Sequence, residues 1–138
     1  QSLARLNSYV EERTAAAQTP EQAVEASVMA FFDYYIDRLF EVQLGMHSFS
    51  GLKHSSLGHD RDEQLNSALT ETLDIMGRAI ADLSKDLGAN EVKAERDAIF
   101  SCLMGTLSLA HTGRAESIET NPQIIMKTHL KGLVARLA

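Results

Sequence analysis

The sequence of 138 residues has one cysteine, two prolines, no tryptophan and few aromatic side chains. Cys102 has no partner for an internal disulfide, which predicts a reducing compartment, the cytoplasm. The longest uncharged stretch, residues 98–113, has sixteen residues and contains serine, threonine and histidine, so it is too short and too polar to span a membrane. With 44% hydrophobic residues, the chain can bury its own core, and we expect a single domain over residues 1–138.

Basic residues are also in short supply. Thirteen lysines and arginines stand against nineteen acidic residues, which gives a formal net charge of −6. The basic residues are scattered along the chain and form no cluster or stripe, so these residues are not expected to bind nucleic acid directly. The first residues have neither the charged nor the apolar region of a secretory signal.

Apolar residues recur at three- and four-residue steps over most of the chain, which predicts helices and no strands. Residues 45–60 break the pattern with glycines and serines, and we expect a loop there, with a short helical piece around Phe49 and Leu52. The expected helices cover residues 2–18, 20–45, 60–88, 90–111 and 122–138.

Cap residues separate the expected helices. Thr19-Pro20 and Asn121-Pro122 each place a capping side chain before a proline at the first helical position. Asp60 and Asn90 are predicted N-caps of the two long middle helices. Two glycines are predicted to end helices, Gly88 as a left-handed cap and Gly113 as a stop.

Residues 98–110 form the most informative segment because they are uncharged on every side of the expected helix. Such a helix must be covered all round, so one side can face the core while the other faces a partner. The last helix also has a wide apolar band, and the pair predicts a four-helix interface between two copies. A central core helix of a monomer is the alternative. The predicted dimer-interface residues are Leu103, Thr106, Leu109, Ile124, Ile125, Thr128 and Leu133.

The predicted fold class is therefore all-α, with five to six helices in an antiparallel bundle. The order of elements includes the segments AFFDYYIDRLFEV, DEQLNSALTETLDIMGRAIADL, AERDAIFSCLMGTLSLAHTGR and NPQIIMKTHLKGLVARLA. This order resembles the C-terminal effector-binding and dimerisation domain of TetR-type transcriptional repressors. The resemblance covers nearly the whole chain and is one of architecture, without an invariant motif.

The resemblance implies a homodimer that senses a small apolar or aromatic effector in a pocket enclosed by the earlier helices. It also implies a helix-turn-helix headpiece, which this sequence lacks ahead of Gln1. Operator DNA would then be bound only through that missing N-terminal domain, and the sequence would be the regulatory part of a longer repressor.

Aromatic, methionine and leucine side chains line up on matching faces of three expected helices. Flexible methionines and uncharged rings suit an adaptable apolar ligand. Tyr35, Gln43, Thr72 and His111 are the polar groups expected to orient it, and the alternative is that the whole set is simply core. The predicted ligand-binding residues are Phe31, Tyr35, Leu39, Gln43, Met46, Leu69, Thr72, Leu73, Met76, Phe100, Met104, Leu107 and His111.

No pattern for catalysis, a cofactor or a metal is present. His47, His54 and His59 have spacings of seven and five residues, which match neither a helical zinc pair nor a zinc finger. No glutamate is followed by histidine three residues later, as a di-metal carboxylate bundle requires. Cys102 is expected to be a small buried hydrophobe. We therefore expect a non-enzymatic domain; a ligand-free dimerisation or scaffold module and a small helical enzyme are the alternatives.

Overall fold

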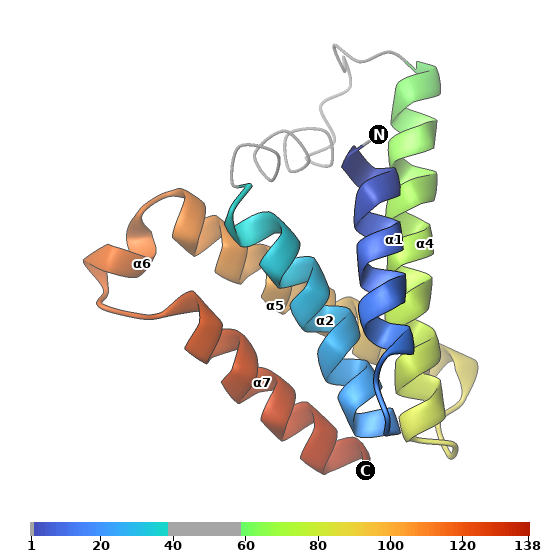
Figure 1. The fold of residues 1–138 in the computed structure, drawn as a ribbon. Helices are drawn as coiled ribbons and strands as arrows, with labels where there is room; N and C mark the ends of the chain where they lie inside the picture. The colour runs from blue at the N-terminus through green and yellow to red at the C-terminus, as the bar shows by residue number, and fades with distance from the viewer. Residues whose placement is uncertain (1, 39–58) are drawn as a thin grey trace.

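A computed structural model of the chain describes residues 2–38 and 59–138 (Figure 1). These residues form six helices and no strand, which confirms the predicted all-α class. The helices are α1 (Ser2–Ala15), α2 (Pro20–Ile36), α4 (His59–Leu83), α5 (Ala89–His111), α6 (Arg114–Ser117) and α7 (Pro122–Leu137).

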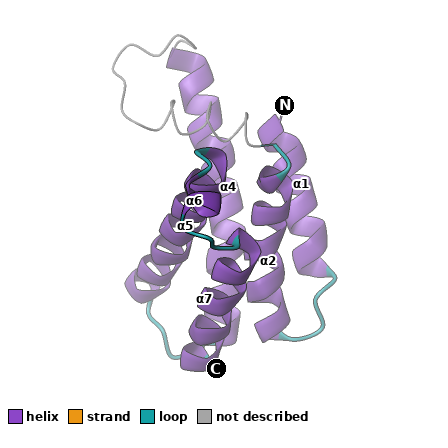
Figure 2. Ribbon diagram, turned by 90° about the vertical axis from the view of Figure 1, so that its left-hand side faces the viewer, coloured by secondary structure: helices purple, strands orange, loops and turns teal. Residues whose placement is uncertain are grey.

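Helix α2 lies at the centre of the described part of the molecule. It packs against α1 and α4 on one side and against α5 and α7 on the other. Helices α1 and α4 run side by side, and α7 returns along α5 after the short helix α6 (Figures 1 and 2). Eight of the seventeen residues of α2 are buried because four other helices cover it.

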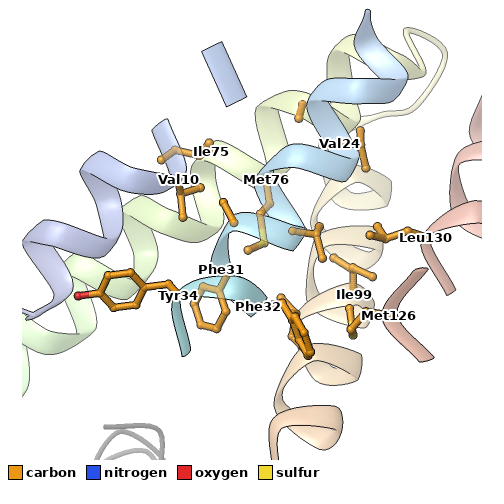
Figure 3. Packing of buried hydrophobic residues seen from close by; sticks show 14 of the residues in the cluster. Val10, Val24, Phe31, Phe32, Tyr34, Ile75, Met76, Ile99, Met126 and Leu130 are labelled. Atoms are coloured by element: carbon orange, nitrogen blue, oxygen red, sulfur yellow. The ribbon is translucent and has the colours of Figure 1, made fainter. Parts of the chain in front are cut away.

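The core is formed by side chains that meet around α2 (Figure 3). Phe32 of α2, Met76 of α4, Ile99 of α5 and Met126 of α7 are fully buried. Full burial of a large apolar side chain stabilises a fold by roughly 1.5–3 kcal/mol. Contacts of this kind between helices far apart in sequence therefore hold the fold together.

Both predicted cap-then-proline starts are confirmed. The Thr19 hydroxyl accepts a hydrogen bond from the Gln22 N–H at 3.1 Å, before Pro20 at the first helical position. The Asn121 side chain accepts hydrogen bonds from the N–H groups of Gln123 and Ile124 at 2.9 and 3.2 Å. Each cap satisfies donors that the first helical turn leaves unpaired.

The predicted junction between the two long middle helices is wrong in detail. Helix α4 ends at Leu83, earlier than residue 88, and Gly88 is extended with φ −75° rather than left-handed. Gly88, not Asn90, is the N-cap of α5. The reason is Glu91, whose carboxylate accepts a hydrogen bond from the Gly88 N–H at 3.0 Å and fixes the helix start there.

The bounds of α2 and α4 also differ from the prediction. Helix α2 ends at Ile36 rather than near residue 45, and the Arg38 guanidinium donates to the Tyr34 carbonyl at 2.8 Å in the last turn. A cation close to the last carbonyl groups of a helix favours a helix end at this point. Helix α4 begins at His59, one residue before the predicted cap Asp60. The predicted loop around Phe49 and Leu52 lies outside the described residues.

The stop after α5 is confirmed, since Gly113 has the left-handed φ of 74°. A side chain would strain the backbone there, which explains the glycine. The link that follows contains the short helix α6, of four residues. Within the described ranges, each helix is either too short or too polar to cross a membrane.

Candidate functional site

Aromatic rings form a continuous cluster that crosses α2 from α1 to α5. The Phe31 ring lies 5.0 Å from Tyr35 and 5.8 Å, edge to face, from Phe100, as measured between ring centroids. Tyr34 lies 5.2 Å from Tyr35 and 5.9 Å from Tyr9 of α1. Tilted and edge-to-face pairs at these distances are favourable beyond the area that they bury. We call these five residues the aromatic cluster.

Among the predicted ligand-binding residues, Phe31 thus contacts both Tyr35 and Phe100. Figure 3 shows Phe31 inside the core near Met76 and Phe32. Five predicted residues are buried and five are half-buried, and all of these except Thr72 and His111 belong to the hydrophobic core or pack against it. The buried residues are Phe31, Tyr35, Thr72, Met76 and Leu107, and the half-buried ones are Leu69, Leu73, Phe100, Met104 and His111. Leu39, Gln43 and Met46 lie outside the described residues.

Thr72 is the one fully buried polar group among these predicted residues that the structure describes. Its hydroxyl donates to the side-chain carbonyl of Asn7, and the Asn7 amide donates to Glu71 at 3.1 Å. A buried hydroxyl needs such a partner because its desolvation is otherwise unfavourable. Thr72 therefore links α4 to α1, in addition to any contact with a ligand.

The sequence analysis missed a polar cluster at the α1 end of the aromatic rings. Arg13 donates to the Tyr9 hydroxyl at 2.5 Å, stacks over the Tyr9 ring at 5.4 Å and lies 3.7 Å from the Asp33 carboxylate. Arg38 stacks over the Tyr34 ring at 4.2 Å. Both pairs have a tyrosine followed four residues later by an arginine. That spacing was visible in the sequence and places the two side chains on one helix face.

The predicted dimer-interface residues divide into two groups. Leu103, Thr106 and Leu133 are buried within the chain itself, where they face the core. A residue that the same chain already covers offers no surface to a second copy. Thr128 and Ile124 are exposed, Ile124 by 62%, and two others are half-buried. The half-buried residues are Leu109 and Ile125.

Ten uncharged residues of α5 and α7 that are exposed or half-buried define a surface that we call the outer face. On α5 its exposed members are small, and residues 98–110 of that helix have no charged side chain. Gly105 and Gly132 both lie open, because a Cβ atom placed on either would meet nothing within 4 Å. The members of the outer face are Ala98, Ser101, Cys102, Gly105 and Leu109 on α5, and Ile124, Ile125, Thr128, Gly132 and Ala135 on α7.

Helices α5 and α7 are joined at one end by an ion pair. The two terminal nitrogens of the Arg136 guanidinium, Nη1 and Nη2, donate to the two carboxylate oxygens of Glu95, at 2.7 and 2.8 Å. These hydrogen bonds lower the pKa of Glu95 and raise the pKa of Arg136. Farther along, the Cys102 thiol lies 3.8 Å from the Met126 sulfur. The two helices are thus fixed side by side, which holds the outer face together as one surface.

The described residues contain no group of three histidine, cysteine, aspartate or glutamate side chains that could hold a metal ion. His47 and His54 lie outside the described residues. Comparison of the chain with protein-family models, with curated proteins and with solved structures finds no match.

Proposed function

We propose that this chain is a homodimeric regulatory domain of the TetR type that senses a small apolar or aromatic molecule. The observation that carries the proposal is the outer face of α5 and α7. It is uncharged along residues 98–110 of α5, contains open glycines and exposes Ile124 by 62%. The order of the helices supports the TetR resemblance.

Gly105 and Gly132 support close approach of a second copy. A glycine inside a helix destabilises it by about 1 kcal/mol relative to alanine, and no contact among the described residues requires glycine at either position. A backbone that comes close to another helix does require it. A two-fold axis through the outer face would pair α5 and α7 of each copy as a four-helix bundle.

The sensing part of the proposal rests on the aromatic cluster. Phe31 and Phe100 would contact the effector, and the cluster continues through Tyr34 to Tyr9 on α1. A ligand that favours one position of α1 relative to the α5 and α7 base would shift the population toward that position. Such coupling requires different ligand affinities in the two positions.

Two exposed isoleucines provide a matched test of the dimer. Ile124 lies on the outer face, whereas Ile118, 64% exposed, lies in the link between α6 and α7. A lysine at position 124 would place a charge in the interface without a partner. We expect Ile124→Lys to give monomers and Ile118→Lys to leave dimers, as measured by sedimentation velocity at micromolar concentration. A monomeric parent protein, or equal dimerisation of both variants, would contradict the proposal.

A second candidate function is a dimerisation module without a ligand. The complete burial of Thr72, Met76 and Leu107 favours it, because fully covered side chains are typical of core. Native mass spectrometry of the purified protein separates the two candidates, since it reports the number of subunits and any bound small molecule together. If a molecule co-purifies, Phe100→Ala should weaken its binding; if Phe100→Ala lowers only the stability, that ring is core.

A further inference from the structure

A groove between α4 and α5 belongs neither to the aromatic cluster nor to the outer face. Its volume is about 470 Å³, within the usual range for sites that bind small molecules. None of the predicted ligand-binding residues lines it. We call it the α4–α5 groove, and the inference drawn from it does not depend on the dimer proposal.

The floor of the groove is apolar and formed by small side chains. It includes Gly77 and Ala81 of α4, Leu87 of the link, and Ala89 and Val92 of α5. Gly77 is buried, and a Cβ atom there would lie 3.6 Å from the Arg96 side chain. The absence of that atom contributes to the depth of the groove. A hydrocarbon group placed on this floor would be removed from water, which favours binding.

The rim of the groove carries three cations, those of Arg78, Lys93 and Arg96, and one carboxylate, that of Asp74, in a protein whose net charge is −6. Two of its three cations are already paired. Lys93 lies 2.6 Å from Asp97, and Arg96 lies 2.9 Å from Asp97 and 3.6 Å from Asp74. The hydrogen bonds from Lys93 and Arg96 lower the pKa of Asp97, which keeps this carboxylate ionised.

Arg78 is the third cation, and it differs from the other two. It lines the groove and is exposed, and it forms no ion pair with any residue in the described ranges. A guanidinium presents two parallel N–H groups that match the two oxygens of a carboxylate. One unpaired guanidinium beside an apolar floor therefore complements one negative charge attached to a hydrocarbon group.

We propose that the α4–α5 groove binds a small organic monocarboxylate. Its carboxylate is held by Arg78, and its hydrocarbon part lies over Gly77, Leu87 and Val92. The binding contact joins α4 to α5, so an occupied groove stabilises the packing of these two helices. Arg78 is the single unpaired cation among the described residues of the rim. The site should therefore bind a molecule with one negative charge more tightly than a neutral molecule.

Benzoate is a suitable probe because it combines one carboxylate with one apolar ring, and benzamide is its neutral counterpart. We expect benzoate to shift the amide NMR signals of Gly77, Ala89 and Val92, with a dissociation constant of about 1 mM, typical of a ligand this small. Benzamide should bind at least several-fold more weakly. Equal binding of the two probes, or signals that move elsewhere in the protein, would overturn the proposal.

Two variants locate the binding groups. Arg78→Gln should weaken benzoate binding about tenfold, because it removes a charge-assisted hydrogen bond. Arg114→Gln is the matched control, since it removes an exposed arginine on α6 away from the groove. An unchanged affinity in Arg78→Gln, or an equal loss in both variants, would overturn the assignment.

Gly77→Ala tests the floor without unfolding the protein. The added Cβ atom makes only ordinary van der Waals contacts, at 3.6 and 3.9 Å, and alanine favours the helix. The variant should therefore unfold at a higher temperature and yet bind benzoate more weakly. Benzoate binding that is unchanged in a stable Gly77→Ala variant would show that the ligand does not use this floor. If an acidic peptide bound more tightly than benzoate, the occupant of the groove would be a peptide rather than a small molecule, and the proposal would be overturned.

Discussion

The two faces of α5 differ in the size of their side chains more than in their polarity. The inner face carries Ile99, Leu103 and Leu107, all of which are fully buried. The outer face carries Ala98, Ser101 and Gly105, which are exposed. The segment 98–110 of α5 has no charged side chain, yet only one of its sides carries large apolar residues. The division into large and small residues therefore identifies the side that packs against the chain's own core.

The largest effect is expected on the inner face. Leu103→Ala leaves a cavity in the hydrophobic core and should lower the free energy of unfolding by about 2–5 kcal/mol. Urea denaturation followed by circular dichroism measures this loss. Ser101→Ala, on the exposed side of the same helix, is the control and should change stability by less than about 0.5 kcal/mol. Comparable losses in the two variants would remove the distinction between the faces.

On the outer face the sign should reverse. Gly105→Ala should raise the stability of the monomer by about 1 kcal/mol, because alanine favours the helix and its Cβ atom meets nothing in the chain. The same methyl group should weaken dimerisation, which sedimentation velocity measures. Ala98→Gly is the converse control and should destabilise the monomer by a similar amount. A Gly105→Ala variant that dimerises as well as the parent would count against close helix approach at this residue.

A smaller effect is expected for the polar group on the inner face. The Thr106 hydroxyl donates to the Cys102 carbonyl at 2.7 Å, one turn earlier in the same helix. Thr106→Val keeps the shape but loses this bond, which should lower stability by about 0.5–1.5 kcal/mol. Thermal unfolding with the isosteric variant measures the change, and Thr112→Val, at an exposed position with the same type of bond, is the comparison. A larger loss at position 112 than at 106 would contradict the difference in burial.

The smallest effect is the pH dependence of the link between α5 and α7. Hydrogen bonds from Arg136 hold the pKa of Glu95 below its ordinary value of 4.5. The stabilisation by ionised Glu95 is therefore complete above pH 4.5 and is lost as the pH falls through the lowered pKa. Glu95→Gln should flatten the fall in stability in that acid range, as measured by urea denaturation at several pH values. An unchanged slope would mean that other carboxylates dominate acid unfolding.

Local signals predicted the fold well where the cause of a structure lies within a few residues. Thr19 and Asn121 were identifiable as caps because a cap, its proline and its bonded N–H groups are neighbours in the chain. Gly88 was misassigned because the hydrogen bond from its N–H to Glu91 competes with the left-handed conformation, and composition does not show which one prevails.

The candidate site was less predictable because it depends on contacts between distant segments. Phe31 and Tyr35 are four residues apart on one helix, so their contact could be expected. The contact of Phe31 with Phe100 joins α2 to α5 and depends on how the helices pack. The same limit applies to Leu103 and Leu109, which both lie in the uncharged segment 98–110 of α5 but differ in burial. The two leucines differ in burial because of the way α5 is rotated about its own axis, which turns Leu103 toward the core and Leu109 toward the surface.

The central position of α2 has a consequence for any change of shape in this domain. Four helices pack against α2, and its buried residues include valine, phenylalanine and tyrosine side chains. Because such a core is closely packed, α2 cannot slide past its neighbours without losing these contacts. A rearrangement is therefore easier for one of the surrounding helices than for α2. Helix α1 is joined to α2 by the Tyr9–Tyr34 ring contact and the Arg13–Asp33 ion pair, so any displacement of α1 must change both contacts.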